Sequence, residues 1–99
     1  ATMPAYVIVD LQEIIDPEKL NAYRPFGAAA VQRYGGRYLA RGGETISLEG
    51  GWTSQRIAIL EFDTLEQARA WYESPEYVEA RKVRDGASQT RIIAVAGVE

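Results

Sequence analysis

The stretch Tyr34-Gly35-Gly36-Arg37-Tyr38-Leu39-Ala40-Arg41-Gly42-Gly43 decides the fold of this chain. Its first glycine pair is typical of a helix end, because glycine readily adopts the left-handed conformation that such an end needs. The residues that follow predict a strand, and the second pair predicts a bulge or sharp bend within it. We therefore expect a helix that Gly35 ends, followed by a strand from Arg37 to about Leu48 that is interrupted at Gly42-Gly43.

The residues upstream of this stretch predict a strand and then a helix. Ala5–Leu11 is rich in β-branched and aromatic residues, and it is apolar on both faces through Val9, which indicates a central strand. Asp16 and Pro17 form a typical helix start, with Asp16 as the N-cap and proline at the first helical position. Pro25 is expected to kink or split this helix near Tyr23.

The residues downstream complete a six-element pattern. We expect a hairpin turn at Glu49-Gly50-Gly51-Trp52, a strand over Arg56–Phe62, a helix capped by Thr64, a second helix from Pro75 to about Asp85, and a strand over Thr90–Ala96. The order is β-α-β-β-α-β, with the second helical position split in two. This order predicts a single α+β domain over residues 1–99, a ferredoxin-like fold with a four-stranded antiparallel sheet.

One face of the expected sheet needs a cover. The helices lie on one side, and alternation along the strands allows Tyr6, Ile8, Ile57 and Ile59 to point to the other. A second subunit can cover these side chains, sheet facing sheet, so we expect a homodimer or a higher assembly. Trp52, next to the hairpin turn, is interpreted as an anchor of such an interface rather than as a ligand contact.

Composition excludes several classes of function. The 99 residues carry a net charge of -3, and the six arginines from Arg24 to Arg69 are spread along the chain rather than forming a stripe, so we expect no nucleic-acid partner. The chain has no cysteine, which excludes a disulfide or thiolate metal site, and no histidine, which excludes the commonest general base and metal ligand. We expect no metal and no cofactor.

The ends of the chain and its hydropathy indicate a location. Ala1-Thr2-Met3-Pro4 lacks a basic region followed by an apolar stretch, so no signal peptide is expected. No apolar run approaches membrane-spanning length. We therefore expect a cytoplasmic protein without a membrane partner.

A cluster of charged residues is the first candidate site. Asp10 shares a face with Tyr6 and Ile8, and Glu61 shares a face with Ile57 and Ile59. We hypothesise that Asp10 and Glu61 lie near the same ends of adjacent parallel strands, with Arg41 opposite Glu61. Two neighbouring carboxylates favour a general base, and an arginine can hold an anionic substrate or intermediate. The alternative is a structural ion-pair network.

Aromatic and basic residues of the second half form a second group. Trp71, Tyr72 and Tyr77 either wall an aromatic ligand pocket or belong to the core face of a helix. Tyr72 is the candidate proton donor, and Tyr38 is counted among the ligand-binding residues. Arg84 and Ser88, one turn apart if the helix continues, are candidates for binding a carboxylate. The alternative for Arg84, and for Arg81 beside it, is an exposed role at the helix end.

Several blocks resemble one family over nearly the whole chain. Residues 4–8 (PAYVI), 34–39 (YGGRYL), 41–43 (RGG), 60–62 (LEF) and 70–77 (AWYESPEY) are similar to the domain-of-unknown-function family 1330. The resemblance implies a dimeric α+β barrel, a fold shared with antibiotic-biosynthesis monooxygenases, muconolactone isomerases and haem-degrading enzymes. The haem-degrading relatives use a histidine ligand, which this chain lacks.

Three functions remain open at this point. The first is a cofactor-independent enzyme acting on a small organic molecule in a cavity between sheet and helices. The second is a small-molecule binding protein without catalysis, which uses the same cavity. The third is a structural homodimer module, which predicts that side chains fill the cavity. The sequence identifies no substrate and no reaction.

Overall fold

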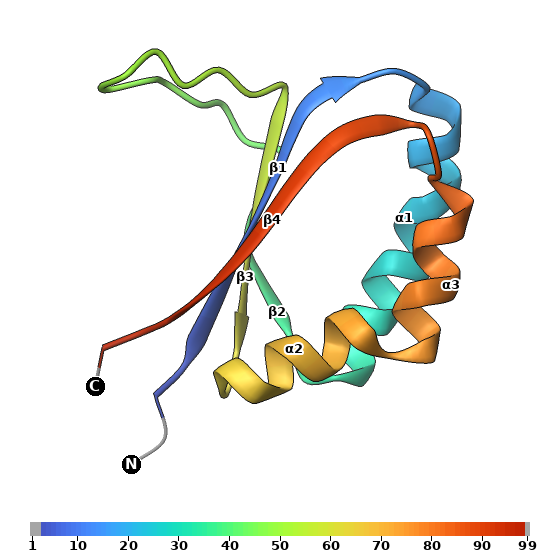
Figure 1. Ribbon diagram of the computed structural model, residues 1–99, viewed down its shortest axis with the longest axis vertical. Helices are drawn as coiled ribbons and strands as arrows, with labels where there is room; N and C mark the ends of the chain where they lie inside the picture. Colours follow the sequence, from blue (N-terminus) through green and yellow to red (C-terminus); the bar gives the residue numbers. More distant parts are fainter. Residues whose placement is uncertain (1–2, 99) are drawn as a thin grey trace.

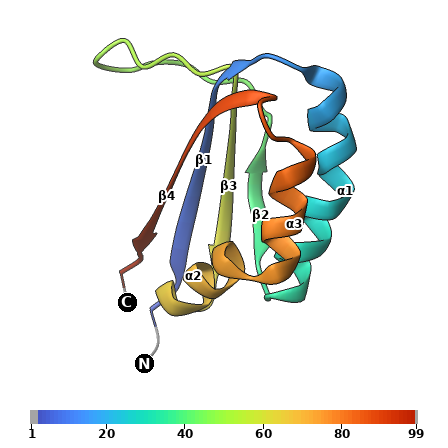
Figure 2. The same ribbon diagram turned by 45° about the vertical axis from the view of Figure 1, so that its right-hand side comes forward.

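The sheet and its helices form two layers in the computed structural model, which describes residues 3–98 (Figures 1 and 2). Ala1 and Thr2, on which the signal-peptide prediction partly rests, lie outside it. The elements are β1 (Ala5–Ile14), α1 (Pro17–Arg33), β2 (Arg37–Arg41), β3 (Arg56–Phe62), α2 (Leu65–Glu73), α3 (Pro75–Val83) and β4 (Ser88–Ala96).

The sheet has the order β2-β3-β1-β4, and all its neighbouring strands are antiparallel. β1 and β3 lie in the centre, as the sequence predicts. All three helices of residues 3–98 cover one face, and the other face is open (Figure 1). The ferredoxin-like α+β fold, with its second helical position divided into α2 and α3, is confirmed.

The polar residues expected to start helices do so. The Asp16 carboxylate accepts a hydrogen bond from the Lys19 N–H at 3.2 Å, and the Thr64 hydroxyl accepts one from the Gln67 N–H at 3.0 Å. Ser74 caps α3, where its hydroxyl accepts the Tyr77 N–H at 3.1 Å. Each cap satisfies a backbone donor that the first helical turn leaves without a partner.

Pro25 does not divide the first helix. α1 runs without a break from Pro17 to Arg33 and includes Pro25, so the expected split near Tyr23 is wrong. Proline removes the hydrogen bond to the carbonyl of Asn21, and both residues are exposed. Water can bind the freed carbonyl on that side, so the helix tolerates the loss of this hydrogen bond.

The second strand is shorter than expected. The Gly42 N–H donates the last hydrogen bond of this strand to the carbonyl of Ile57, at 3.0 Å. Gly42 itself has a φ of 72° and turns the chain out of the sheet. The expected bend is present, but the strand does not resume, so the prediction of a strand up to Leu48 is wrong. β3 begins at Arg56, only two residues before Ala58, the partner of Arg41, so it is too short to pair with a strand that continues to Leu48. Residues 42–55 instead form a loop that projects beyond the sheet, away from the helices (Figure 1).

Gly36 is required by close packing of the core. A Cβ at this position would lie 2.7 Å from the ring of Phe62 and 2.8 Å from Cγ1 of Val31, closer than carbon atoms approach one another. Phe62 and Val31 are buried, so neither can move away without disturbing its neighbours. Gly35, just before it, ends α1 with a φ of 77°, as predicted.

Gly36→Ala should lower the free energy of unfolding by about 1–3 kcal/mol through overpacking. Urea unfolding followed by tryptophan fluorescence measures this loss. Gly43→Ala is the matched control, because a Cβ there meets nothing within 4 Å and its φ is not in the left-handed region. Equal losses in the two variants would contradict the packing argument.

Candidate functional site

The predicted pair of carboxylates is not brought together. β1 and β3 are antiparallel, and the register places Asp10 opposite Ile57 and Glu61 opposite Tyr6. Asp10 and Glu61 share the open face of the sheet, as alternation predicts, but they lie toward opposite ends of their paired strands. The hypothesis of adjacent parallel strands is therefore wrong, and the two carboxylates cannot share a proton.

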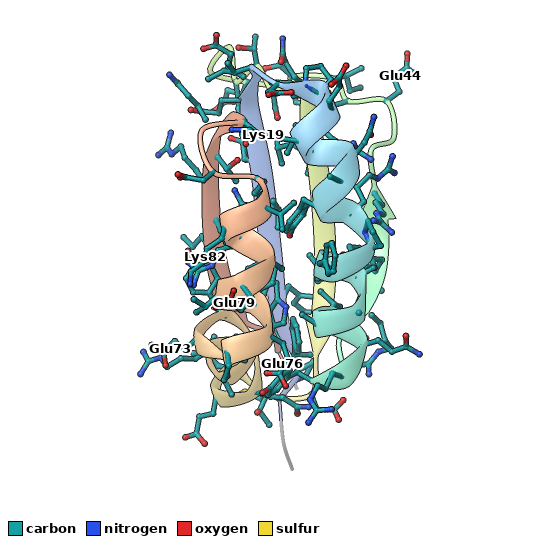
Figure 3. All side chains as sticks on the ribbon, turned by 90° about the vertical axis from the view of Figure 1, so that its right-hand side faces the viewer. Lys19, Glu44, Glu73, Glu76, Glu79 and Lys82 are labelled. Carbon is teal, nitrogen blue, oxygen red and sulfur yellow. The ribbon has the colours of Figure 1, made fainter. Side chains whose placement is uncertain are left out.

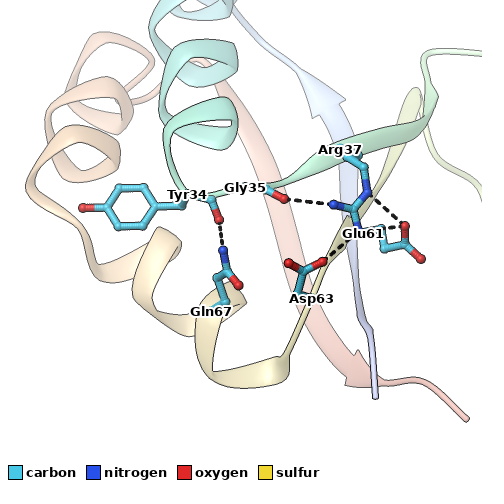
Figure 4. A network of polar contacts seen from close by, with 6 residues as sticks. All are labelled: Tyr34, Gly35, Arg37, Glu61, Asp63 and Gln67. Carbon is cyan, nitrogen blue, oxygen red and sulfur yellow. Dashed lines mark hydrogen bonds and ion pairs between the residues drawn. The ribbon is translucent and has the colours of Figure 1, made fainter. Parts of the chain in front are cut away.

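Glu61 belongs to an ion-pair network with Arg37 rather than with Arg41. The register pairs Arg37 with Glu61 and Arg41 with Ala58. The Arg37 guanidinium donates to Glu61 at 3.0 and 3.1 Å and to Asp63 at 3.2 Å (Figure 4). This network ties the start of β2 to the end of β3, which corresponds to the structural alternative for Glu61.

Asp10 lies buried on the open face, beneath the 42–55 loop. Its Oδ2 accepts a hydrogen bond from the indole N–H of Trp52 at 3.1 Å, and its Oδ1 has no protein donor within the described part of the chain. The indole itself is half exposed. Asp10 therefore positions the loop, and it is separated by the sheet from the cavities described next.

A cavity of about 770 Å³, here the wide cavity, lies between α2, α3 and β4. The helices that cover it are seen from outside in Figure 3, where α3 lies beside α1 over the sheet. Four predicted ligand or catalytic residues line it: Trp71, Tyr72, Arg84 and Ser88. Ser88 begins β4 instead of continuing the helix, so the expected spacing of one helical turn between Arg84 and Ser88 is wrong, although both residues line this cavity.

Charged and hydroxyl groups gather around this cavity. The Arg81 guanidinium stacks 3.9 Å above the ring of Tyr72 and donates to the Tyr72 carbonyl at 3.2 Å, which holds the tyrosine in place. The hydroxyls of Ser88 and Thr90 are 2.7 Å apart. Glu73 also lines the cavity, so acidic, basic and hydroxyl groups face one space.

A smaller cavity, here the arginine pocket, lies on the other side of Trp71 and has a volume of about 80 Å³. Its polar lining consists of Tyr23, Arg24, Tyr38, Arg41, Arg56 and Tyr77. Tyr38, Arg41 and Tyr77 are predicted site residues, and the structure brings them together here. Because these arginines lie far apart in the sequence, their spacing does not reveal that they line one pocket.

Arg24, Arg56 and Tyr23 were not predicted from the sequence as site residues. The sequence contained one signal for Arg56. Residues 56, 58, 60 and 62 share one face of the strand, and the strongly apolar Leu60 and Phe62 indicate that this face is turned toward the helices. No comparable signal exists for Arg24, since a position on a helix surface does not reveal which strand it faces.

Tyr23 and Tyr77 of the arginine pocket form a hydrogen-bonded pair. Their hydroxyl oxygens are 2.6 Å apart, and the rings meet edge to face. Burial raises the pKa of Tyr23 far above its usual range, and the neighbouring Tyr77 raises it further. A Cβ at Gly27, one turn along α1, would lie 2.7 Å from the Tyr23 hydroxyl, so this glycine leaves the space that the hydroxyl occupies.

The described residues contain neither a metal-binding cluster nor a membrane-spanning helix. Among residues 3–98, no group of three or more acidic, histidine or cysteine side chains is arranged to hold a metal ion. In the same part of the chain, no helix has both the length and the apolar character that crossing a membrane requires.

The family assignment follows from a match along the whole domain. The profile of a domain of unknown function, DUF1330, matches residues 4–98. The chain belongs to the DUF1330 family. No curated protein matches this DUF1330 chain.

Solved structures confirm the fold of the DUF1330 chain. A protein of unknown function from Rhodopseudomonas palustris has a TM-score of 0.77 and 19% identity, with 100% of this chain and 85% of that chain covered. A cofactor-independent oxygenase from Streptomyces nogalater has a TM-score of 0.64 and 13% identity, covering 100% and 96%. A dimeric protein of unknown function and ferredoxin-like fold from Bacteroides fragilis has a TM-score of 0.57 and 19% identity, covering 94% and 95%.

The raised pKa of Tyr23 predicts a loss of stability at high pH. An unfolded tyrosine releases its proton near pH 10, whereas folded Tyr23 retains it, so this contribution is complete below about pH 10 and is lost as the pH rises. Above that pH the free energy of unfolding should fall by about 1.4 kcal/mol per pH unit from this group. Tyr23→Phe should reduce the fall.

Urea midpoints measured at about pH 9 and pH 11 compare the variant with the wild type. Tyr6→Phe, on the open face of the sheet, is the control. A Tyr23→Phe protein that loses as much stability over this interval as the wild type would refute the assignment.

Proposed function

We propose that this protein is a cofactor-independent enzyme that acts on a small organic molecule bound in the wide cavity. The observation that carries the proposal is a cavity of about 770 Å³ with an aromatic wall and both acidic and basic groups. Cavities of about 300–1,000 Å³ with a few convergent polar groups are typical of small-molecule sites.

The residues of the cavity divide into three roles. Trp71 and Tyr72 form the wall, and the Tyr72 hydroxyl is the proton donor. Arg81 holds the Tyr72 ring in place by stacking on it. Arg84 binds an anionic group of the substrate or intermediate. Glu73 is the candidate base, in place of Asp10 and Glu61, which lie on the other face of the sheet.

The shared fold adds limited support. The oxygenase from Streptomyces nogalater is described as cofactor-independent, and its chain has the same fold. A fold accommodates many activities, so this likeness argues only that the scaffold is compatible with such chemistry.

The second candidate is a binding protein without catalysis. Glu73 is exposed, which makes it a poorly shielded base and favours this alternative. A purely structural module is less well supported, because it predicts a cavity filled by side chains. A cytoplasmic location stays a prediction from the sequence.

Turnover and binding can be separated with two variants. Purified, dialysed protein is incubated with a panel of small aromatic and carboxylated compounds, with thermal shift reporting binding and mass spectrometry reporting products. For a compound that is converted, Tyr72→Phe should lower the rate by about 10²–10⁴-fold while binding persists. Arg84→Gln should weaken binding of acidic compounds by about tenfold.

Tyr6→Phe should leave both rate and binding unchanged, because Tyr6 lies on the open face. Stabilisation of the wild type by a compound that is never converted would favour the binding protein. Conversion at the wild-type rate by Tyr72→Phe would exclude Tyr72 as the proton donor.

A second copy of the chain is proposed to cover the open sheet face. Ile93 and Val95 of β4 are 64% and 51% exposed there, next to Ile8 and Ile59 of the central strands. Such a continuous apolar surface favours association. The relative from Bacteroides fragilis is described as dimeric, which is consistent with this assembly.

Ile93→Asp should convert the dimer to a monomer, because a charge on this surface would be buried without a partner. Sedimentation velocity measures the mass in solution. Phe26→Asp is the control, since Phe26 is similarly exposed, at 58%, but lies on α1 on the helical side. A monomeric wild type, or dissociation by both variants, would contradict the proposed interface.

A further inference from the structure

Three arginine side chains from three separate elements line the arginine pocket. Arg24 comes from the middle of α1, Arg41 from the last position of β2 and Arg56 from the first position of β3. Arg24 and Arg41 are exposed and Arg56 is half-buried, so the charges stand at the solvent side of the pocket. The remaining lining is uncharged, with no carboxylate.

None of these guanidiniums has an ion-pair or hydrogen-bond partner among residues 3–98. No carboxylate oxygen of that part of the chain lies within 4.0 Å of Arg24, Arg41 or Arg56, and no protein acceptor takes a hydrogen bond from them. The chain carries 14 acidic and 11 basic residues, so carboxylates are in excess. Their absence here is not explained by a shortage of acidic residues.

Gathering these charges is unfavourable without an anion. Burial lowers the pKa of Arg56, and the nearby charges of Arg24 and Arg41 lower it further. Like charges at a partly desolvated site repel one another, and an anion placed among them removes that repulsion.

The local backbone and side chains hold two of the arginines in position. The Arg41 guanidinium lies 4.4 Å from the ring centroid of Tyr38. Gly42 follows with a φ of 72°, and a Cβ at this residue would lie 3.1 Å from Nε of Arg56. Any larger residue at Gly42 would both strain the backbone and press on that guanidinium.

We propose that the arginine pocket binds a small carboxylate that has an apolar body. The three guanidiniums face the carboxylate, and bidentate hydrogen bonds suit its planar geometry. The inner walls receive the apolar body, and they are formed by Val9, Leu11, Leu20, Ala58 and Leu60. Inorganic phosphate satisfies the charges but leaves these walls uncovered, so it is expected to bind more weakly.

This site is separate from the wide cavity, since Trp71 lies between the two and lines both. The three arginines of the proposal lie on α1, β2 and β3, and none of them lines the wide cavity. It therefore stands or fails independently of the enzymatic function proposed above.

Calorimetric titration of the full chain tests the proposal with three probes. Butyrate carries the expected charge and an apolar body, inorganic phosphate carries the charge alone, and butylamine carries the same body with the opposite charge. Butyrate should bind at least about tenfold more tightly than the other two. Phosphate binding as tightly as butyrate would overturn the carboxylate assignment, and butylamine binding as tightly would overturn the role of charge.

Two variants locate the bound anion. Arg56→Met keeps the length of the side chain, and Arg24→Gln changes an exposed position that folding tolerates. Each should weaken butyrate binding by about tenfold or more. Without butyrate, Arg56→Met should unfold at the same temperature as the wild type or higher, because repulsion among the arginines is relieved.

Two further arginines serve as controls with the same change in net charge. Arg33 lies at the end of α1, and Arg69 lines the wide cavity. The variants Arg33→Gln and Arg69→Gln should both keep wild-type affinity for butyrate. Undiminished butyrate binding in Arg56→Met and Arg24→Gln would overturn the proposal. Loss of binding in Arg69→Gln alone would place the anion in the wide cavity and would also overturn it.

Discussion

The packing of Trp71 between Phe62 and Tyr77 is the interaction on which the rest of the structure depends. Its ring centroid lies 5.3 Å from that of Phe62 on β3 and 4.4 Å from that of Tyr77 on α3. Tyr77 is joined in turn to Tyr23 of α1 through their hydroxyls, 2.6 Å apart. This aromatic series connects the sheet to all three helices of the described chain, and it leaves a space on each side of Trp71 that side chains do not fill.

The two spaces differ in their charge. The wide cavity has acidic and basic groups at its edge, so internal pairing can balance its charge. The charged groups of the arginine pocket are all positive, and no carboxylate of residues 3–98 forms an ion pair with them, although the chain has a net charge of -3. A cluster of this kind lowers the stability of the empty protein and gains its favourable energy only when an anion is present, as is common at binding sites.

Local sequence patterns predicted most of the fold because they act over a few residues. Asp16, Thr64 and Ser74 cap the helices at the expected positions, and alternation correctly assigned Tyr6 and Ile8 to the open face. The error over Asp10 and Glu61 was avoidable, since an antiparallel sheet already requires its two central strands to run in opposite directions. The early end of β2 at Arg41 was missed although the start of β3 at Arg56 was predicted correctly, because the sequence does not reveal the register, which pairs Arg41 with Ala58.

By itself, the sequence determined the order of the elements, the ends of the helices and the faces of the strands, because these follow from short-range hydrogen bonding and from the periodicity of apolar residues. Only the tertiary structure decided which charged residues meet. Arg24 and Arg41 are 17 positions apart along the chain, and Arg41 and Arg56 are 15 apart. Their convergence depends on how α1 lies on the sheet and on the register of β2 with β3. Exposed charges leave no periodic signal of that long-range geometry, whereas buried apolar side chains do.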